Sequence, residues 1–388
     1  QSLINSFLKS DGFEALVSAR MKGEAQASIL IRGAVDQIDE AVFVQTLTDA
    51  VAETVRRQVA SGVDIVSDGE QSKISYATYI KDRITGFEGD SPRRTPKDLE
   101  VFPNYGAWAS RSGGVPDYKR PKCVGPIEVK SMEPLNEDLG FFTQALQQSK
   151  PAGAFMNAAS PGVIALFQPN EYYANDDEYL EALAEAMRVE YEGIVNAGFQ
   201  LQLDSPDLGL GRHMMFKDAD DDVYMARIAR HVEVLNHATR NIAPEQMRMH
   251  ICWGNYEGPH VCDVGLEVIL PTVLKARPAA LLFETANPRH GHEWQVIRDQ
   301  ADQIPEEKIL IPGVIDSTSN FVEHPELVAE RIERFANIVG RERVIAGTDC
   351  GFSTFAGFGS VQTDVVWAKL KTLADGAELA SSRLWGAR

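Results

Sequence analysis

The sequence predicts one α/β barrel of eight parallel strands, a (β/α)8 or TIM-type fold, spanning residues 1–388 as a single domain. Short apolar runs alternate with amphipathic helical segments, which indicates successive parallel βαβ units. Polar residues follow the end of one apolar run after another, as they do at the carboxyl-terminal rim of a barrel. The length also fits, because α/β barrels of this size often form one domain.

The βαβ units can be followed along the chain. The first predicted helix covers residues 40–60, where valines and leucines recur at helical spacing, and a strand follows near residues 63–66. A further strand is predicted at residues 154–157. Later helices precede strands in the same way: 179–197 before 199–204, 222–240 before 247–252, 264–276 before 280–284, 294–303 before 309–316, and 325–340 before 344–350.

These runs account for seven strands, and Cys123–Val129 is a candidate for the eighth. An open doubly wound sheet is the competing fold, but no Gly-rich phosphate turn follows an early strand. Residues 86–122 are rich in Pro, Gly, Ser, Lys and Arg. They predict an irregular loop insertion, of the kind that often serves as a functional loop or lid.

The composition excludes several classes of function. The formal net charge of -18 opposes binding to nucleic acid or to an anionic membrane. No run of about 18 apolar residues could span a bilayer, and the N-terminus lacks the pattern of a signal peptide. Four scattered cysteines do not form a disulfide framework, so a reducing cytoplasm is expected. Homo-oligomerisation stays open.

Residues that can bind metal stand at the ends of the predicted strands. His250 and Cys252 lie two apart on one strand and therefore point to the same face. Glu284 and Cys350 end two later strands on the same rim. Two thiolates, an imidazole and a carboxylate suit tetrahedral zinc, which can hold a substrate thiol as the nucleophilic thiolate. Each of these residues alone could equally be an ordinary buried group.

Several neighbouring residues remain ambiguous. Trp253 and Asn255 follow the His-x-Cys strand and are expected to line a substrate pocket, although a packed loop would explain them as well. His290 and His292 could belong to a metal cluster, or could cap a helix or bind an anion beside Arg289.

Six segments together resemble the catalytic domain of cobalamin-independent methionine synthase, from about residue 45 to the C-terminus. That resemblance implies a zinc site formed by His250, Cys252, Glu284 and Cys350. It further implies that Glu70 and Asp204 bind the substrate amine and that Asp316 belongs to the substrate site. The matching segments are Val66–Glu70, Gln202–Pro206, His250–Cys252, Phe283–Thr285, Pro312–Asp316 and Thr348–Phe352.

Two departures from that family pattern affect the expected reaction. The full-length synthase has two barrels, so this chain resembles the short members, a group that includes epoxyalkane:coenzyme M transferase. Ser317 and its neighbours stand where the full-length enzymes carry a histidine thought to act as an acid, which argues against a folate donor. The Gly-Ser-x-Pro turn of the family's first strand is also absent. It is expected upstream of Gln1, and Cys123–Val129 would then lie outside the barrel.

The predicted function is that of a zinc-dependent transferase that alkylates a small thiol, homocysteine-like if Glu70 and Asp204 bind an ammonium group. The partners are that thiol and an alkyl donor. One alternative is addition of a sulfonated thiol to an epoxide, with Arg289 or a basic residue of the 86–122 loop near the anion. Others are a metal-independent barrel lyase or decarboxylase, and a zinc protein without catalysis.

Overall fold

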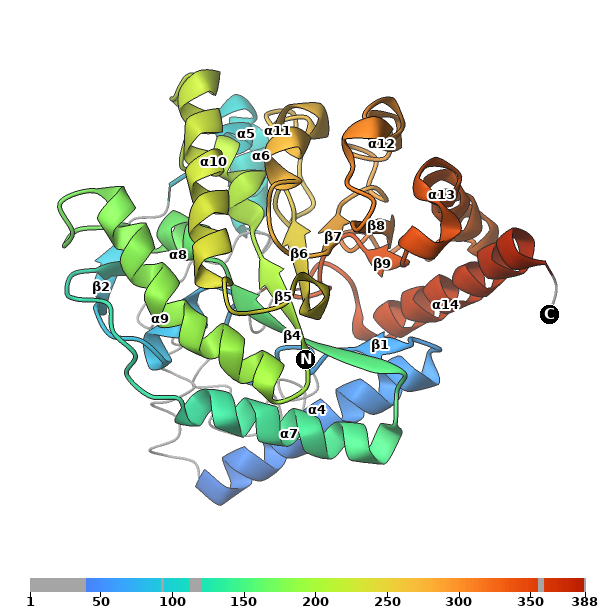
Figure 1. Cartoon of the computed structure of the whole chain (residues 1–388), viewed down its shortest axis with the longest axis horizontal. Coiled ribbons are helices and arrows are strands. Elements are labelled where there is room, and N and C mark those ends of the chain that lie inside the picture. Colours follow the sequence, from blue (N-terminus) through green and yellow to red (C-terminus); the bar gives the residue numbers. More distant parts are fainter. Residues whose placement is uncertain (1–39, 92–93, 112–119, 355–358, 387–388) are drawn as a thin grey trace.

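A computed structural model describes residues 40–91, 94–111, 120–354 and 359–386. Its main sheet curls around a central axis, with helices on the outer face (Figure 1). All its pairings are parallel, and the order is β1-β4-β5-β6-β7-β8-β9. The predicted barrel class is confirmed. The strands are β1 (Ile65–Val66), β4 (Gly153–Ala159), β5 (Gln200–Asp204), β6 (Met247–Ile251), β7 (Ala280–Phe283), β8 (Ile309–Ile315) and β9 (Gly347–Thr348).

Most of the helices connect successive strands, while the first precedes β1 and the last follows β9. They are α4 (Glu40–Ala60), α7 (Glu133–Ser149), α8 (Pro161–Phe167), α9 (Asp176–Asn196), α10 (Asp221–Ala238), α11 (Leu266–Val273), α12 (Trp294–Asp299), α13 (Pro325–Val339) and α14 (Thr363–Trp385). Short 3₁₀ helices are η1 (Thr78–Asp82), η2 (Pro206–Leu208), η3 (Leu210–Arg212), η4 (Pro244–Gln246), η5 (Ala301–Gln303) and η6 (Arg341–Arg343). No helix among the described residues is long and apolar enough to cross a bilayer.

Local sequence explains where two of these helices begin, and the central strands are buried along their length. Ser160 caps α8 by accepting a hydrogen bond from the N–H of Val163, and Asn175 caps α9 in the same way through Glu178. All residues of β6 and β7 are buried. Both faces of these parallel strands are covered, so even Arg248 and His250 in β6 are buried.

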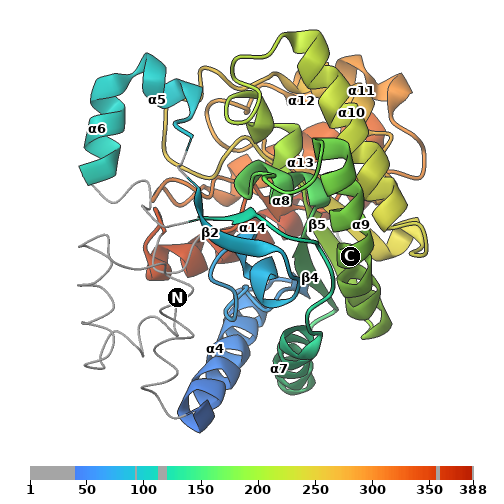
Figure 2. The ribbon, with the colours of Figure 1, turned by 90° about the vertical axis from the view of Figure 1, so that its left-hand side faces the viewer.

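The prediction for residues 86–122 is wrong in part, because most of the described residues there form regular structure. β2 (Phe87–Ser91) pairs antiparallel with β3 (Arg120–Cys123), and two short helices, α5 (Lys97–Val101) and α6 (Pro103–Arg111), lie between them. The helices stand away from the barrel in Figure 2. Tertiary contacts override the weak local propensity. Asp98 accepts hydrogen bonds from the Tyr256 hydroxyl and the N–H of Cys262.

The pairing of β3 also decides between the two readings of Cys123–Val129. The segment is not the eighth barrel strand, because its first residue belongs to the β2–β3 pair outside the main sheet. The interpretation that places it outside the barrel is confirmed. The prediction that the first strand lies upstream of Gln1 falls outside the described residues and stays a prediction.

Two features at the C-terminal end differ from the sequence pattern. The last strand is shorter than residues 344–350, because an irregularity in register interrupts its pairing with β8. Helix α14 was not predicted, although apolar residues such as Val366, Leu373 and Ala380 face the core from it. Lys369 of the same helix is fully buried and forms an ion pair with Glu323.

Close packing between α13 and α14 makes Gly376 a sensitive position. A Cβ atom there would lie 2.4 Å from the Cβ of Val328, which no real contact tolerates. We expect Gly376→Ala to lower the free energy of unfolding by about 1–3 kcal/mol in urea denaturation, the usual cost of overpacking. Gly140 in α7 is the matched control, because a Cβ atom at that helical glycine would meet nothing within 4 Å. A Gly140→Ala change should be neutral or stabilising; equal loss in both variants would contradict this packing explanation.

Candidate metal and substrate site

The carboxyl ends of the parallel strands bring polar side chains from distant parts of the sequence to one rim. Asp204 and His250 are paired directly across β5 and β6. Glu284 immediately follows β7, and Cys350 lies two residues after β9. This is where the βα loops of a barrel converge and where its active sites form.

The four predicted metal ligands come together there. The ligand atoms of His250, Cys252 and Cys350 all lie within 4.8 Å of one another. The Cys350 sulfur is 3.5 Å from Nε2 of His250 and 3.6 Å from Oε1 of Glu284. A tetrahedral zinc ion, bound by sulfur at about 2.3 Å and by nitrogen or oxygen at about 2.0–2.1 Å, sets such atoms about 3.5 Å apart. The donor set and its spacing therefore fit zinc.

The electrostatics of these donors point the same way. Their side chains are all buried, with the residues between 4 and 8 % exposed. A hydrogen bond with Cys350 is the main cause that lowers the pKa of Cys252 to about 6. Burial, followed by the charge of Asp349, raises the pKa of Glu284 to about 7. Several acidic groups thus crowd one buried space, an arrangement that a divalent cation would relieve.

Glu284 is held by its surroundings on both oxygens. The backbone N–H of Trp253 donates to Oε1 at 2.9 Å, and the Asn287 side-chain amide donates to Oε2 at 2.7 Å. Asp349 fixes this turn in place: it accepts the backbone N–H groups of residues 285, 286 and 287. The Asn287 amide bridges the two carboxylates, because it also donates to Asp349 at 3.1 Å.

The Asp349 contacts predict a measurable role in metal binding. We expect Asp349→Asn to weaken zinc binding by about 10–100-fold, the usual effect of losing a group that orients a metal ligand. Competition with a chromogenic zinc chelator would measure the change. Asp299→Asn on the exposed surface of α12 is the control and should leave the affinity as it is. Unchanged affinity in Asp349→Asn would show that the Glu284 turn does not depend on this carboxylate.

Residues from two other loops position the backbone of Cys350. Ser317 accepts a hydrogen bond from the N–H of Cys350 and donates to Oδ1 of Asn255. The Asn255 amide also donates to the carbonyl of Gly351 at 2.6 Å and to the hydroxyl of Thr354. Asn255, predicted to line the pocket, thus connects the loop after β6 to the Cys350 loop after β9. Ser317, which follows β8, bridges the two through its hydroxyl.

Trp253 and Asp316, which were also predicted to line the substrate site, form hydrogen bonds with neighbouring residues. The Trp253 side chain is completely buried, and its indole N–H donates to the Val264 carbonyl. Asp316 accepts hydrogen bonds from the backbone and hydroxyl of Thr318, and is 8 % exposed. In this arrangement Trp253 supports Glu284 from behind, through its backbone N–H.

Glu70 and Asp204 lie on either side of Asn157. The Asn157 side-chain amide donates to Asp204 at 3.0 Å. The Asn157 carbonyl accepts from Lys73, whose Nζ is 3.2 Å from Oε1 of Glu70. Glu70 has a φ of 51°, a left-handed conformation that non-glycine residues adopt at a cost. The nearby charge of Asp204 adds to burial, the larger cause, in raising the pKa of Glu70.

Sequence reasoning missed Lys73, although it stands only three residues after Glu70. Its side chain is buried, and Nζ also lies 4.5 Å from the centroid of the Tyr79 ring. A lysine three residues after an acidic residue normally suggests an exposed helical pair, so its spacing carried no signal of a site.

His290 and His292, which the sequence offered as possible members of one metal cluster, lie in different environments. His292 is exposed, whereas His290 is buried in a second cluster behind Trp253, and the centroids of the His290 and Trp253 rings lie 4.2 Å apart.

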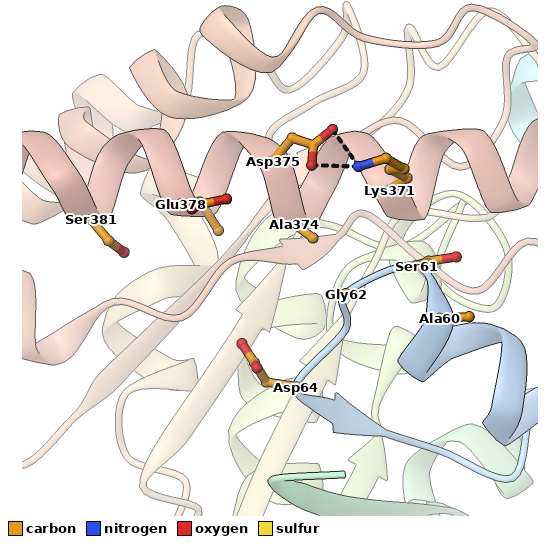
Figure 3. Close-up of a pocket in the computed structure, with 10 residues that line it drawn as sticks. Ala60, Ser61, Gly62, Asp64, Lys371, Ala374, Asp375, Glu378 and Ser381 are labelled. Atoms are coloured by element: carbon orange, nitrogen blue, oxygen red, sulfur yellow. Dashed lines mark hydrogen bonds and ion pairs between the residues drawn. The ribbon is translucent and has the colours of Figure 1, made fainter. Parts of the chain in front are cut away.

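A cavity of about 380 Å³ lies at the opposite end of the sheet, between the segment before β1 and helix α14 (Figure 3). Lys371 and Asp375 pair beside it, and none of the predicted site residues lines it.

Comparison with known proteins agrees with this geometry. Residues 162–375 match the family model described as the catalytic domain of cobalamin-independent synthase. A methionine synthase of Saccharolobus solfataricus is 25 % identical over 345 residues, which cover 88 % of this chain and 86 % of that protein. One from Thermococcus kodakarensis is 22 % identical, with coverage of 90 % and 87 %.

Solved structures show the same fold. A B12-independent methionine synthase from a Shewanella species, in complex with selenomethionine, superposes with a TM-score of 0.69 at 20 % identity and covers 90 % of this chain and 92 % of its own. A putative vitamin-B12-independent methionine synthase from Listeria monocytogenes gives 0.59 at 18 % identity, with coverage of 96 % and 94 %.

Proposed function

The chain belongs to the family of the cobalamin-independent synthase catalytic domain, and from that premise we propose that it is a zinc-dependent enzyme that methylates the thiol of homocysteine. Its relatives over most of its length are named methionine synthases, which places it among methyltransferases. We further propose that residues 1–388 act as one catalytic domain.

One observation carries the zinc proposal: in a buried space, the Cys350 sulfur lies 3.5 Å from a nitrogen of His250 and 3.6 Å from an oxygen of Glu284, and the three residues come from separate strand ends. His250, Cys252, Glu284 and Cys350 would hold the ion. When bound there, zinc supplies a Lewis acid that keeps a substrate thiol deprotonated at neutral pH. A metal-independent lyase would have no use for such a donor set.

The remaining residues would bind and orient the acceptor. Glu70 and Asp204 would accept hydrogen bonds from its ammonium group, and both are anchored by Asn157 and its neighbours. Lys73 would hold Glu70 in place and balance part of the negative charge. With its amine fixed, the acceptor sulfur is directed at the methyl carbon of the donor for an in-line substitution.

The residue contacts weigh against the sulfonated-thiol alternative. Arg289, one of its expected anion partners, is exposed, and its backbone N–H is bound to Asn287. Ser317 contacts Asn255 and Cys350, and no histidine stands in that stretch. We therefore propose a donor that needs no such acid, such as a methylated corrinoid, in preference to a folate.

A methyl-transfer assay tests this proposal. Zinc-loaded protein would be incubated with homocysteine and either methylcobalamin or a methylated folate, and methionine would be detected by mass spectrometry. We expect methionine from the corrinoid donor, its loss on chelation with an unchanged circular dichroism spectrum, and its return with zinc. Full activity of the metal-free protein would contradict the proposal.

A further inference from the structure

A second group of metal-competent side chains lies behind the first. We call it the three-histidine cluster: His213, His260 and His290, with Asp263 and Asp98. Its members come from the loops after β5, β6 and β7 and from helix α5. All five side chains are strongly buried, with at most 11 % of their surface exposed.

The outer ring nitrogens of two histidines are already engaged. Nε2 of His260 lies 3.0 Å from the carbonyl oxygen of Tyr256, and Nδ1 of His290 lies 3.0 Å from a Glu293 oxygen. A carbonyl oxygen can only accept, so Nε2 of His260 carries a proton. These contacts orient the two rings toward the centre of the cluster.

The inner nitrogens converge on one carboxylate. Nδ1 of His260 and Nε2 of His290 lie 2.8 and 3.0 Å from Oδ2 of Asp263. On its other side, Nδ1 of His213 lies 3.2 Å from Oδ1 of Asp263 and 3.8 Å from Oδ2 of Asp98. The ligand atoms thus form two groups that share Asp263, one with His260 and His290 and the other with His213 and Asp98, each within 4.8 Å.

His213 gives an independent reason to expect a ligand. It is 1 % exposed; within the part of the chain that the structure describes, Nε2 has no partner, and Nδ1 faces Oδ1 of Asp263 at 3.2 Å without the alignment of a hydrogen bond. Oδ1 of Asp263 is likewise buried without one. Buried polar atoms that lack partners are costly and rare, so each needs a physical explanation.

We propose that this cluster binds a second divalent metal ion of the class that prefers imidazole, such as zinc, through His213, Asp263 and Asp98, while His260 and His290 hold Asp263 from its other side. One ion would satisfy His213 and Oδ1 of Asp263 together. The rival arrangement has no metal and holds buried imidazolium groups instead. Burial lowers the pKa of His290, but hydrogen bonds to Asp263 and Glu293 outweigh it and raise the pKa to about 10.

The burial of the cluster indicates a structural role, because a closed site leaves no open position for substrate. The ion would join the loops after β5 and β6 to the insertion that contains α5. It would also brace the first site, because His290 stacks on Trp253, whose backbone N–H holds Glu284. The inference is independent of the proposed reaction.

Metal stoichiometry and X-ray absorption of the full chain test this proposal. After zinc loading and dialysis we expect two equivalents per chain, with about one sulfur neighbour per zinc on average, because only the first site has sulfur ligands. His213→Ala and Asp263→Asn should each remove one equivalent and leave zinc with about two sulfur neighbours. His231→Ala is the control, a buried histidine bound to Asp207 outside the cluster, and should keep two equivalents.

Saturation of the unmodified chain at one equivalent with about two sulfur neighbours would overturn the second site and support the rival imidazolium arrangement. One equivalent without sulfur would support the cluster and count against the proposed catalytic zinc. These readings use the unmodified protein, so they hold even where a variant fails to fold.

Discussion

Replacing Cys350 by serine is expected to lower kcat/KM for thiol methylation by at least about 1000-fold, because the Lewis acid that activates the thiol is worth several kcal/mol. The same variant should lose the sulfur-rich zinc, since its sulfur lies 3.5 Å from His250 and 3.6 Å from Glu284. Steady-state kinetics together with metal analysis would measure both effects.

Cys123→Ser is the matched control for this loss. Cys123 is also buried, but it lies in β3, outside the main sheet and away from the four ligands. It should keep its zinc and its activity. If Cys350→Ser loses no more activity than Cys123→Ser, the Cys350 thiolate has no part in catalysis.

Removing the charges of Glu70 and Asp204 should affect the acceptor selectively. We expect the double variant Glu70→Gln/Asp204→Asn to raise KM for homocysteine by about 10–100-fold, because hydrogen bonds to charged groups contribute about 1.5–3 kcal/mol each. The comparison thiol is γ-mercaptobutyrate, which is homocysteine without its amine, and its KM should change little. Parallel kinetics with the two thiols would separate these effects.

The selectivity between the two thiols is the decisive quantity. A merely structural role of the carboxylates would weaken both thiols equally, and that result would contradict amine recognition. Lys73→Met offers a second check, because it removes the ion pair that holds Glu70 and leaves Glu70 itself unchanged. Its loss should raise KM for homocysteine in the same selective manner.

Much of the barrel could be predicted from the sequence because its central strands are buried on both faces. β6 and β7 are uninterrupted buried runs, and their ends carry His250 and Glu284. Strand-end position then predicted which side chains would share the rim. The four proposed ligands do lie together, since the register of the parallel strands leaves them little choice.

What the sequence did not predict depends on contacts between distant segments. Helix α5 forms because Asp98 bonds to residues more than 150 positions away, and no local pattern encodes that. The packing of helix α14 depends on Gly376, which sits against Val328, and on the buried Lys369, which pairs with Glu323. The members of the three-histidine cluster are far apart in the sequence, at positions such as 98, 213 and 290. The sequence therefore showed His290 only beside His292, which is exposed.

X-ray absorption at the zinc edge, with and without homocysteine, tests the proposed thiol activation most directly. Zinc-loaded protein should gain one sulfur neighbour per chain when homocysteine is added, from about two to about three, as a light-atom ligand gives way. The Cys350→Ser variant should show no such gain. An unchanged sulfur count in the unmodified protein at saturating homocysteine would contradict the claim that zinc activates the acceptor thiol.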